Sequence, residues 1–131
     1  MWTQFMDMHS GGASKEEWEY IYIEAPEEEA IVIFYNRFGH NPNRVTCTCC
    51  GDDYSISESE TLEHVTAYER GCLFDKQQGR YVDKPDKSST WNKYRTLDEY
   101  KKDPSVLFIG KQEIKPEQRT GEVPDEGYVW V

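Results

Sequence analysis

The sequence predicts an α+β domain with a mainly antiparallel sheet and two or three short helices, and three observations support this class. Short apolar segments with the period of a strand alternate with segments that carry helix-start signals. No internal repeat and no low-complexity linker divides the chain. A length of 131 residues with 37% hydrophobic content suits one core of ordinary size. We therefore expect a single domain over residues 1–131, with the helices packed on the sheet.

The first part of the chain predicts a β-hairpin. The stretch "MWTQFMDM" places Trp2, Met6 and Met8 on one face at the period of a strand. The stretch "EWEYIYIEA", from Glu17 to Ala25, is rich in tyrosine and isoleucine, which favour strands. The turn-forming residues "HSGGAS" between the two stretches are typical of a hairpin connection.

A helix is predicted from Pro26 to Phe38. Proline suits a first helical turn, three glutamates follow where the helix dipole favours negative charge, and Gly39 stands where a left-handed C-cap is expected. The alternative is that "AIVIFY", from Ala30 to Tyr35, forms a buried strand, because the segment is apolar and β-branched. Periodicity does not separate the two structures, so both stay open at this point.

Two capping boxes predict the remaining helices. Ser57 with Glu60 precedes an apolar stripe at helical spacing, formed by Leu62, Val65, Tyr68 and Cys72. Thr96 with Glu99 precedes a short "LDEYKK" helix, which Pro104 ends.

The segments around the last of these helices complete the predicted fold. The stretch from Asp75 to Tyr94 is polar and turn-rich, and it predicts an exposed loop or a loose hairpin. Further on, "VLFIG" predicts a buried strand and "YVWV" a last strand.

The stretch "RVTCTCCGDDY" holds three of the four cysteines and raises the question of a metal site. Cys47 and Cys50 form a C-x-x-C pair followed by glycine, which resembles a zinc knuckle, where a tight turn brings two thiolates to one ion. The candidate ligands of a tetrahedral zinc site are Cys47, Cys50, Cys72 and His40, with His64 as the alternative histidine. Core packing of the cysteines is the other explanation, and a redox dithiol a third. The turn "GDDYSIS" disfavours the dithiol, which needs its first cysteine at a helix N-terminus.

The chain is acidic, with 25 acidic residues against 15 basic ones and a net charge of -10. Because this charge opposes phosphate binding, we do not expect direct nucleic-acid binding. No apolar segment reaches the length of a bilayer, and the N-terminus lacks the features of a signal peptide, so we expect a soluble, unexported protein. The acidity either serves solubility alone or recognises a basic partner surface. In the second case the candidate partner-binding residues are Glu16, Glu17, Glu19, Glu27, Glu28, Glu29, Asp52 and Asp53.

The block from Phe38 to Ser57, "FGHNPNRVTCTCCGDDYSIS", resembles small proteins of unassigned function that are encoded by tailed bacteriophages. The resemblance implies a phage-encoded protein that acts in the bacterial cytoplasm, where small acidic proteins often bind and block host machinery. We therefore expect a binding protein that inhibits a host defence or nucleic-acid enzyme by occupying a basic groove.

The alternative function is a small enzyme, or a sponge for a nucleotide signal, that holds a phosphate-bearing ligand. Aromatic residues and the basic loop around Lys84, Lys87, Lys93 and Arg95 would hold that ligand. We rank binding above catalysis because the sequence contains no P-loop, dinucleotide fingerprint, metalloprotease motif or nucleophile elbow. A contiguous acidic surface would favour the inhibitor, whereas a pocket with converging histidine, arginine and tyrosine would favour the alternative.

Overall fold

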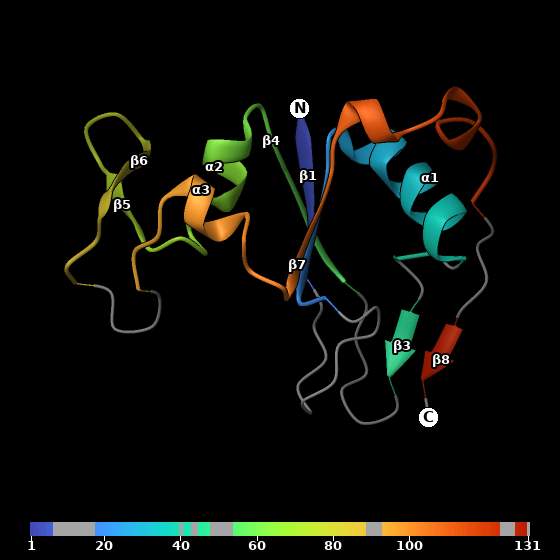
Figure 1. Cartoon of the computed structure of the whole chain (residues 1–131), viewed down its shortest axis with the longest axis horizontal. Coiled ribbons are helices and arrows are strands. Elements are labelled where there is room, and N and C mark those ends of the chain that lie inside the picture. Colours follow the sequence, from blue (N-terminus) through green and yellow to red (C-terminus); the bar gives the residue numbers. More distant parts are fainter. Residues whose placement is uncertain are drawn as a thin grey trace.

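A four-stranded sheet forms the centre of the computed structural model, which describes residues 1–6, 18–39, 41–42, 45–47, 54–88, 93–123 and 128–130. The sheet has the order β4-β1-β2-β7, with β1 (Trp2–Met6), β2 (Tyr20–Ile23), β4 (Ser55–Ser59) and β7 (Val106–Ile109). Strand β1 is antiparallel to both β2 and β4, whereas β7 is parallel to β2. Consequently β2, β4 and β7 run in one direction and end at the same edge of the sheet (Figure 1).

The antiparallel pairing of β1 with β2 confirms the two predicted N-terminal strands, whose connecting turn lies outside the described residues. Helices cover both faces of the sheet: α1 (Glu27–Phe38) lies on one side, and α2 (Leu62–Thr66) and α3 (Leu97–Tyr100) lie on the other (Figure 1). Because side chains alternate along a strand, β2 serves two cores. Ile21 and Ile23 pack in the cluster that contains Phe34 of α1, while Tyr22 packs in the cluster that contains Leu62 and Tyr100.

Helix α1 follows the predicted pattern closely. It begins directly after Pro26, carries its three glutamates in the first turn, and buries Ala30, Ile33 and Phe34 against the sheet. Gly39 ends it with φ 83°, and the Gly39 N–H donates to the Tyr35 carbonyl at 2.8 Å. This left-handed C-cap confirms the helix and excludes the strand alternative for "AIVIFY".

Helix α2 begins later than its sequence predicts. Ser57 belongs to β4 and pairs with Gln4 of β1, so it does not form a capping box with Glu60. Thr61 caps the helix instead, because its side chain accepts a hydrogen bond from the His64 N–H at 3.2 Å. The helix covers five residues, and the chain turns at Gly71, which has φ 72°. The predicted stripe therefore breaks: Tyr68 is exposed, and Cys72 lies in a strand.

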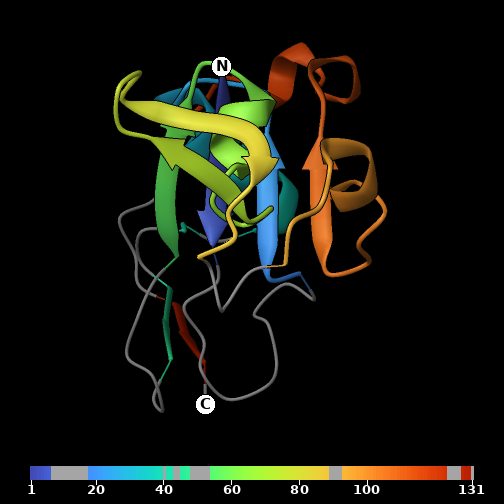
Figure 2. The ribbon, with the colours of Figure 1, turned by 90° about the vertical axis from the view of Figure 1, so that its left-hand side faces the viewer.

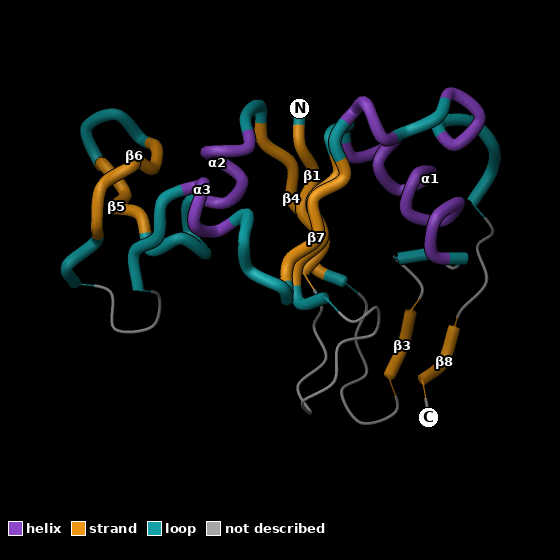
Figure 3. Tube along the Cα trace, in the orientation of Figure 1, coloured by secondary structure: helices purple, strands orange, loops and turns teal. Residues whose placement is uncertain are grey.

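That strand is β5 (Cys72–Asp75), which pairs with β6 (Arg80–Pro85) in an antiparallel hairpin that is separate from the central sheet (Figure 3). Of the two structures predicted for residues 75–94, an exposed loop or a loose hairpin, the hairpin is thus confirmed. Seen from the hairpin side, it lies across α2 (Figure 2). A second small sheet pairs β3 (Val45–Cys47) in parallel with β8 (Tyr128–Trp130), where the last strand was expected.

The remaining elements also agree with their sequence signals. Thr96 and Glu99 form the predicted capping box at the start of α3, and the predicted apolar strand is β7. Two short 3₁₀ helices, η1 (Lys111–Glu113) and η2 (Pro116–Gln118), follow β7. The domain is therefore α+β, as predicted, and its described residues form three α-helices and a mainly antiparallel central sheet. Within the described part of the chain, none of the helices has the length and apolar character required to cross a membrane.

Candidate functional site

Acidic side chains gather at the edge of the sheet where β2, β4 and β7 end. Glu24 directly follows β2, Glu58 and Glu60 lie at the end of β4, and Glu113 lies in η1 after β7. Helix α1 begins at this edge and adds Glu27 and Glu28, whose side chains are exposed. We call this surface the acidic edge, and it consists of Glu24, Glu27, Glu28, Glu58, Glu60 and Glu113.

Backbone N–H groups hold several of these carboxylates in place. The Glu27 N–H, at the start of α1, donates to Glu58 Oε2 at 2.8 Å, and this hydrogen bond links the end of β4 to the start of α1. The Lys111 N–H donates to Glu24 Oε1 at 2.8 Å, and the Gly110 N–H donates to Glu113 Oε2 at 3.0 Å. A carboxylate with a fixed position loses less side-chain entropy when a partner binds it.

The structure divides the residues that were predicted to bind a partner. Glu27 and Glu28 lie in the acidic edge, whereas Glu29 is half-buried and forms an ion pair with Arg119 at 3.0 Å. Glu19 is exposed, but it precedes β2 and so lies at the other end of that strand. The other four predicted residues, Glu16, Glu17, Asp52 and Asp53, lie outside the described residues.

The predicted zinc ligands are only partly described. Cys72 is buried at the start of β5; its thiol is 4.0 Å from Asp83 Oδ1, and burial raises the pKa of the thiol. Cys47 lies in β3, which is at the opposite end of the molecule from β5 in Figure 1. Cys50 and His40 lie outside the described residues. The described residues contain no group of three or more potential ligands, and the zinc site stays a prediction.

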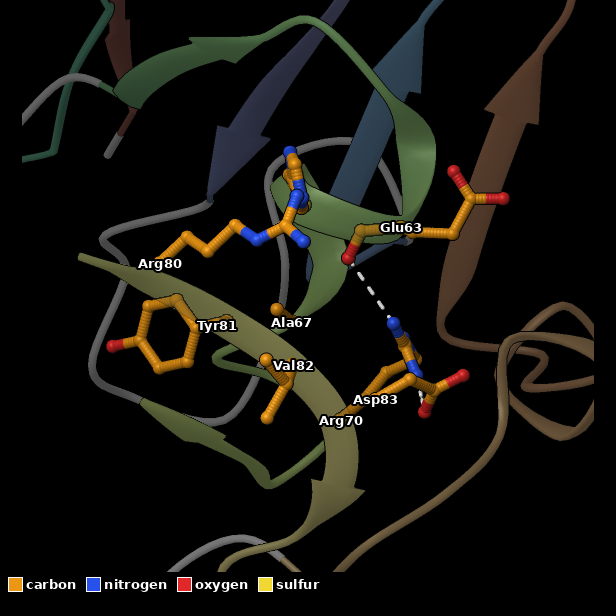
Figure 4. A pocket seen from close by; sticks show the side chains of 8 residues that line it. Glu63, Ala67, Arg70, Arg80, Tyr81, Val82 and Asp83 are labelled. Carbon is orange, nitrogen blue, oxygen red and sulfur yellow. Dashed lines mark hydrogen bonds and ion pairs between the residues drawn. The ribbon is translucent and has the colours of Figure 1, made fainter. Parts of the chain in front are cut away.

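A second feature is the groove between α2 and the β5–β6 hairpin, with a volume of about 260 Å³ (Figure 4). Residues of α2 and the turn after it form one wall, and Arg80 to Asp83 of β6 form the other. The walls bring together a histidine, two arginines and a tyrosine, namely His64, Arg70, Arg80 and Tyr81. Sequence reasoning placed basic residues in this stretch but did not place α2 beside it.

Arg70 has a structural part in this groove. Its side chain is 1% exposed, and Nη1 lies 3.0 Å from Asp83 Oδ1 in an ion pair. Further hydrogen bonds run from Nε to Thr66 Oγ1 at 2.9 Å, from Nη2 to the Glu63 carbonyl at 3.1 Å and from Nη1 to the Arg95 carbonyl at 3.3 Å. These bonds join α2, β6 and the segment before α3. Arg70 therefore fastens the hairpin to the domain.

Gln4, Tyr22 and Tyr100 form a buried polar cluster, and the half-buried Glu69 lies beside it. The Gln4 side-chain amide donates to the Tyr22 hydroxyl at 2.9 Å, and the hydroxyls of Tyr22 and Tyr100 lie 2.9 Å apart. Burial raises the pKa of Glu69 beside them, although a hydrogen bond from Gln4 opposes that shift. Burial likewise raises the pKa of Tyr22, and the charges of Tyr100 and Glu69 add to the shift. No motif in the sequence marked Glu69.

Comparisons with protein-family models, with curated proteins and with solved structures found no match to this chain.

Proposed function

We propose that this protein is a binding protein whose acidic edge occupies a basic groove on a protein partner. One observation carries the proposal: carboxylates from three strand ends and the start of α1 converge on one edge. Four strands at about 4.8 Å spacing make this edge about 14 Å long. Duplex DNA of that length carries about eight phosphate charges, and the edge carries a comparable set of six carboxylates.

The partner that we propose is a bacterial nucleic-acid enzyme or defence enzyme, because a groove built for phosphates offers the complementary charge. The resemblance of the Phe38–Ser57 block to phage proteins supplies the biological setting of the proposal, which is inhibition of host machinery. Solubility alone would be served by scattered carboxylates. Backbone N–H groups that hold Glu24, Glu58 and Glu113 support recognition of a partner instead.

The alternative, a small enzyme or a sponge for a nucleotide signal, has one observation in its favour, which is the groove that brings together His64, Arg70, Arg80 and Tyr81. It has less support than protein binding, because the basic loop is committed in part to structure. Arg95 donates to Asp103 Oδ2 at 2.8 Å, and its guanidinium lies 4.7 Å from the ring centre of Tyr100. Arg70 in the groove is bonded to four acceptors. We therefore rank protein binding first.

Capture from a bacterial lysate tests the proposal. Immobilised protein is expected to retain a host protein at low salt, and double-stranded DNA in excess is expected to release it, because both anions compete for one groove. A variant with Glu27→Lys and Glu28→Lys is expected to lose the capture. We leave Glu29 unchanged in this variant because it pairs with Arg119.

The matched control changes the same amount of charge away from the edge, with Asp98→Lys and Glu122→Lys, both exposed. This control variant is expected to keep the captured protein. If DNA does not release that protein, or if both variants lose it equally, total charge rather than the acidic edge is responsible and the proposal is wrong.

A further inference from the structure

The groove between α2 and the β5–β6 hairpin brings the half-buried ring of Tyr81 together with an available arginine, and we propose that it binds one nucleotide unit. In this proposal the base lies against the aromatic side chains of the hairpin, and the phosphate binds Arg80. The inference is independent of the acidic edge, because the hairpin is a separate sheet (Figure 3).

The hairpin and the turn just before it hold most of the large apolar side chains that are exposed in the described part of the chain. Leu73 and Phe74 lie in β5, Tyr68 lies in the turn, and only Met1 lies elsewhere. Tyr68 is 62% exposed, and Leu73 and Phe74 are 40% and 46% exposed. Phe74 pairs across the hairpin with Tyr81, with the rings edge to face at 5.1 Å, and Tyr81 lines the groove. Aromatic faces of this kind bind bases by stacking, whatever the base.

Arg80 provides the charge for the phosphate. Its Nε donates to Gln78 Oε1 at 3.1 Å, and within the described chain Nη1 and Nη2 have no hydrogen-bond partner. These two nitrogens form the fork that binds phosphate oxygens in a bidentate manner. Figure 4 shows Arg80 reaching from β6 across the groove towards α2.

The two carboxylates of the groove do not oppose the phosphate strongly. Asp83 is paired with Arg70 at 3.0 Å and accepts a hydrogen bond from the Tyr94 hydroxyl at 2.6 Å, so its negative charge is offset by the guanidinium of Arg70. The carboxylate of Glu63 points away from Arg80 in Figure 4. The groove thus presents the charge of Arg80 between walls that include the apolar residues Ala67 and Val82.

The local charge balance differs from that of the whole chain. From Asp75 to Arg95 six basic residues stand against three acidic ones, whereas the chain carries -10. Exposed charges beyond about 8 Å are largely screened at physiological ionic strength, so the local excess governs binding at the hairpin. A volume of about 260 Å³ is small compared with typical sites for larger ligands and suits a single unit.

Titration of the isotope-labelled protein with adenosine monophosphate, and separately with a short oligothymidylate, tests the inference by NMR. Chemical-shift changes at Arg80, Tyr81 and Ala67 are expected with at least one probe. Changes with the mononucleotide alone assign a free nucleotide as the ligand. Changes with the oligonucleotide, tighter than with the mononucleotide, assign a unit within a single strand.

Variants identify the groups responsible. Arg80→Gln is expected to weaken the bound probe about tenfold or more, since hydrogen bonds to charged groups contribute this much, and Tyr81→Leu is expected to weaken it because the flat ring is lost. The matched control is Lys102→Gln, an exposed basic residue after α3, which is expected to bind as the unchanged protein does. Melting temperatures establish that each variant is folded. The absence of shift changes with both probes, or equal weakening by Arg80→Gln and Lys102→Gln, would overturn the inference, while leaving the acidic edge untested by this experiment.

Discussion

Replacement of Arg70 by lysine is the perturbation for which the structure gives the clearest magnitude. The arginine side chain is 1% exposed and bonds to Thr66, Asp83, Glu63 and Arg95. A lysine keeps the positive charge near Asp83, but a single ammonium group cannot reproduce the planar fork that reaches the three other acceptors. At about 1 kcal/mol for each lost hydrogen bond, we expect the free energy of unfolding to fall by about 3 kcal/mol.

Urea denaturation, followed by the fluorescence of the four tryptophans, measures this loss. With a denaturant slope of about 1–3 kcal/mol/M, the midpoint is expected to fall by about 1–3 M. Arg80→Lys in the same hairpin is the matched control, because Arg80 is exposed and its replacement is expected to change stability by less than about 0.5 kcal/mol. If Arg70→Lys is as stable as this control, the bonds of Arg70 do not fasten the hairpin and the reasoning is refuted.

Three further predictions concern the helix cap, the half-buried glutamate and the cysteines. Gly39→Val is expected to destabilise the protein by about 1–2 kcal/mol in thermal or urea unfolding. The φ angle of Gly39 is 83° and no atom lies within 4 Å of a new Cβ, so the whole cost is backbone strain. Gly39→Asn is expected to cost less, and equal stability of the two variants would argue against the left-handed cap. Because burial raises the pKa of Glu69 in the folded protein, its stabilising contribution is complete below its unfolded pKa of about 4.3 and is lost as pH rises through the folded pKa. The unfolding free energies of Glu69→Gln and the unchanged protein are therefore expected to diverge in favour of the variant as the pH rises above about 4.3, and a constant difference would contradict the shift. If Cys50 is a zinc ligand, elemental analysis is expected to find about one equivalent of zinc, and Cys50→Ser is expected to lose the metal and much of the protein's stability. If the purified protein contains no metal and its melting temperature is unchanged in the variant, the cysteines are explained by core packing instead.

Local sequence signals predicted those elements that local interactions determine. Gly39 and the pair of Thr96 and Glu99 act within one or two helical turns, so their patterns were sufficient to place α1 and α3. The pair of Ser57 and Glu60 carries the same pattern, but pairing with β1 extends β4 through Ser57 and moves the helix start to Thr61. Tertiary pairing here outweighs a local preference that contributes about 1 kcal/mol.

The candidate site needed information that the sequence did not contain. The acidic edge depends on β7 being parallel to β2, because only a parallel pairing places Glu113, which follows β7, at the same edge of the sheet as Glu24. Strand direction is a non-local property, and composition alone placed the acidic residues in separate clusters along the chain. The burial of Arg70 could not be predicted either, because arginine is mostly exposed and two of its acceptors, Asp83 and the Arg95 carbonyl, belong to segments farther along the chain.

The acidic edge is tested most directly by the rate of association with the captured partner as ionic strength rises. For the unchanged protein we expect the rate to fall steeply with salt, because screening removes the attraction between the carboxylates and a basic groove. At low salt the variant with Glu27→Lys and Glu28→Lys is expected to associate at least about tenfold more slowly, whereas the control with Asp98→Lys and Glu122→Lys is expected to stay close to the unchanged protein. Equal association rates for the two variants at every salt concentration would contradict recognition through the acidic edge.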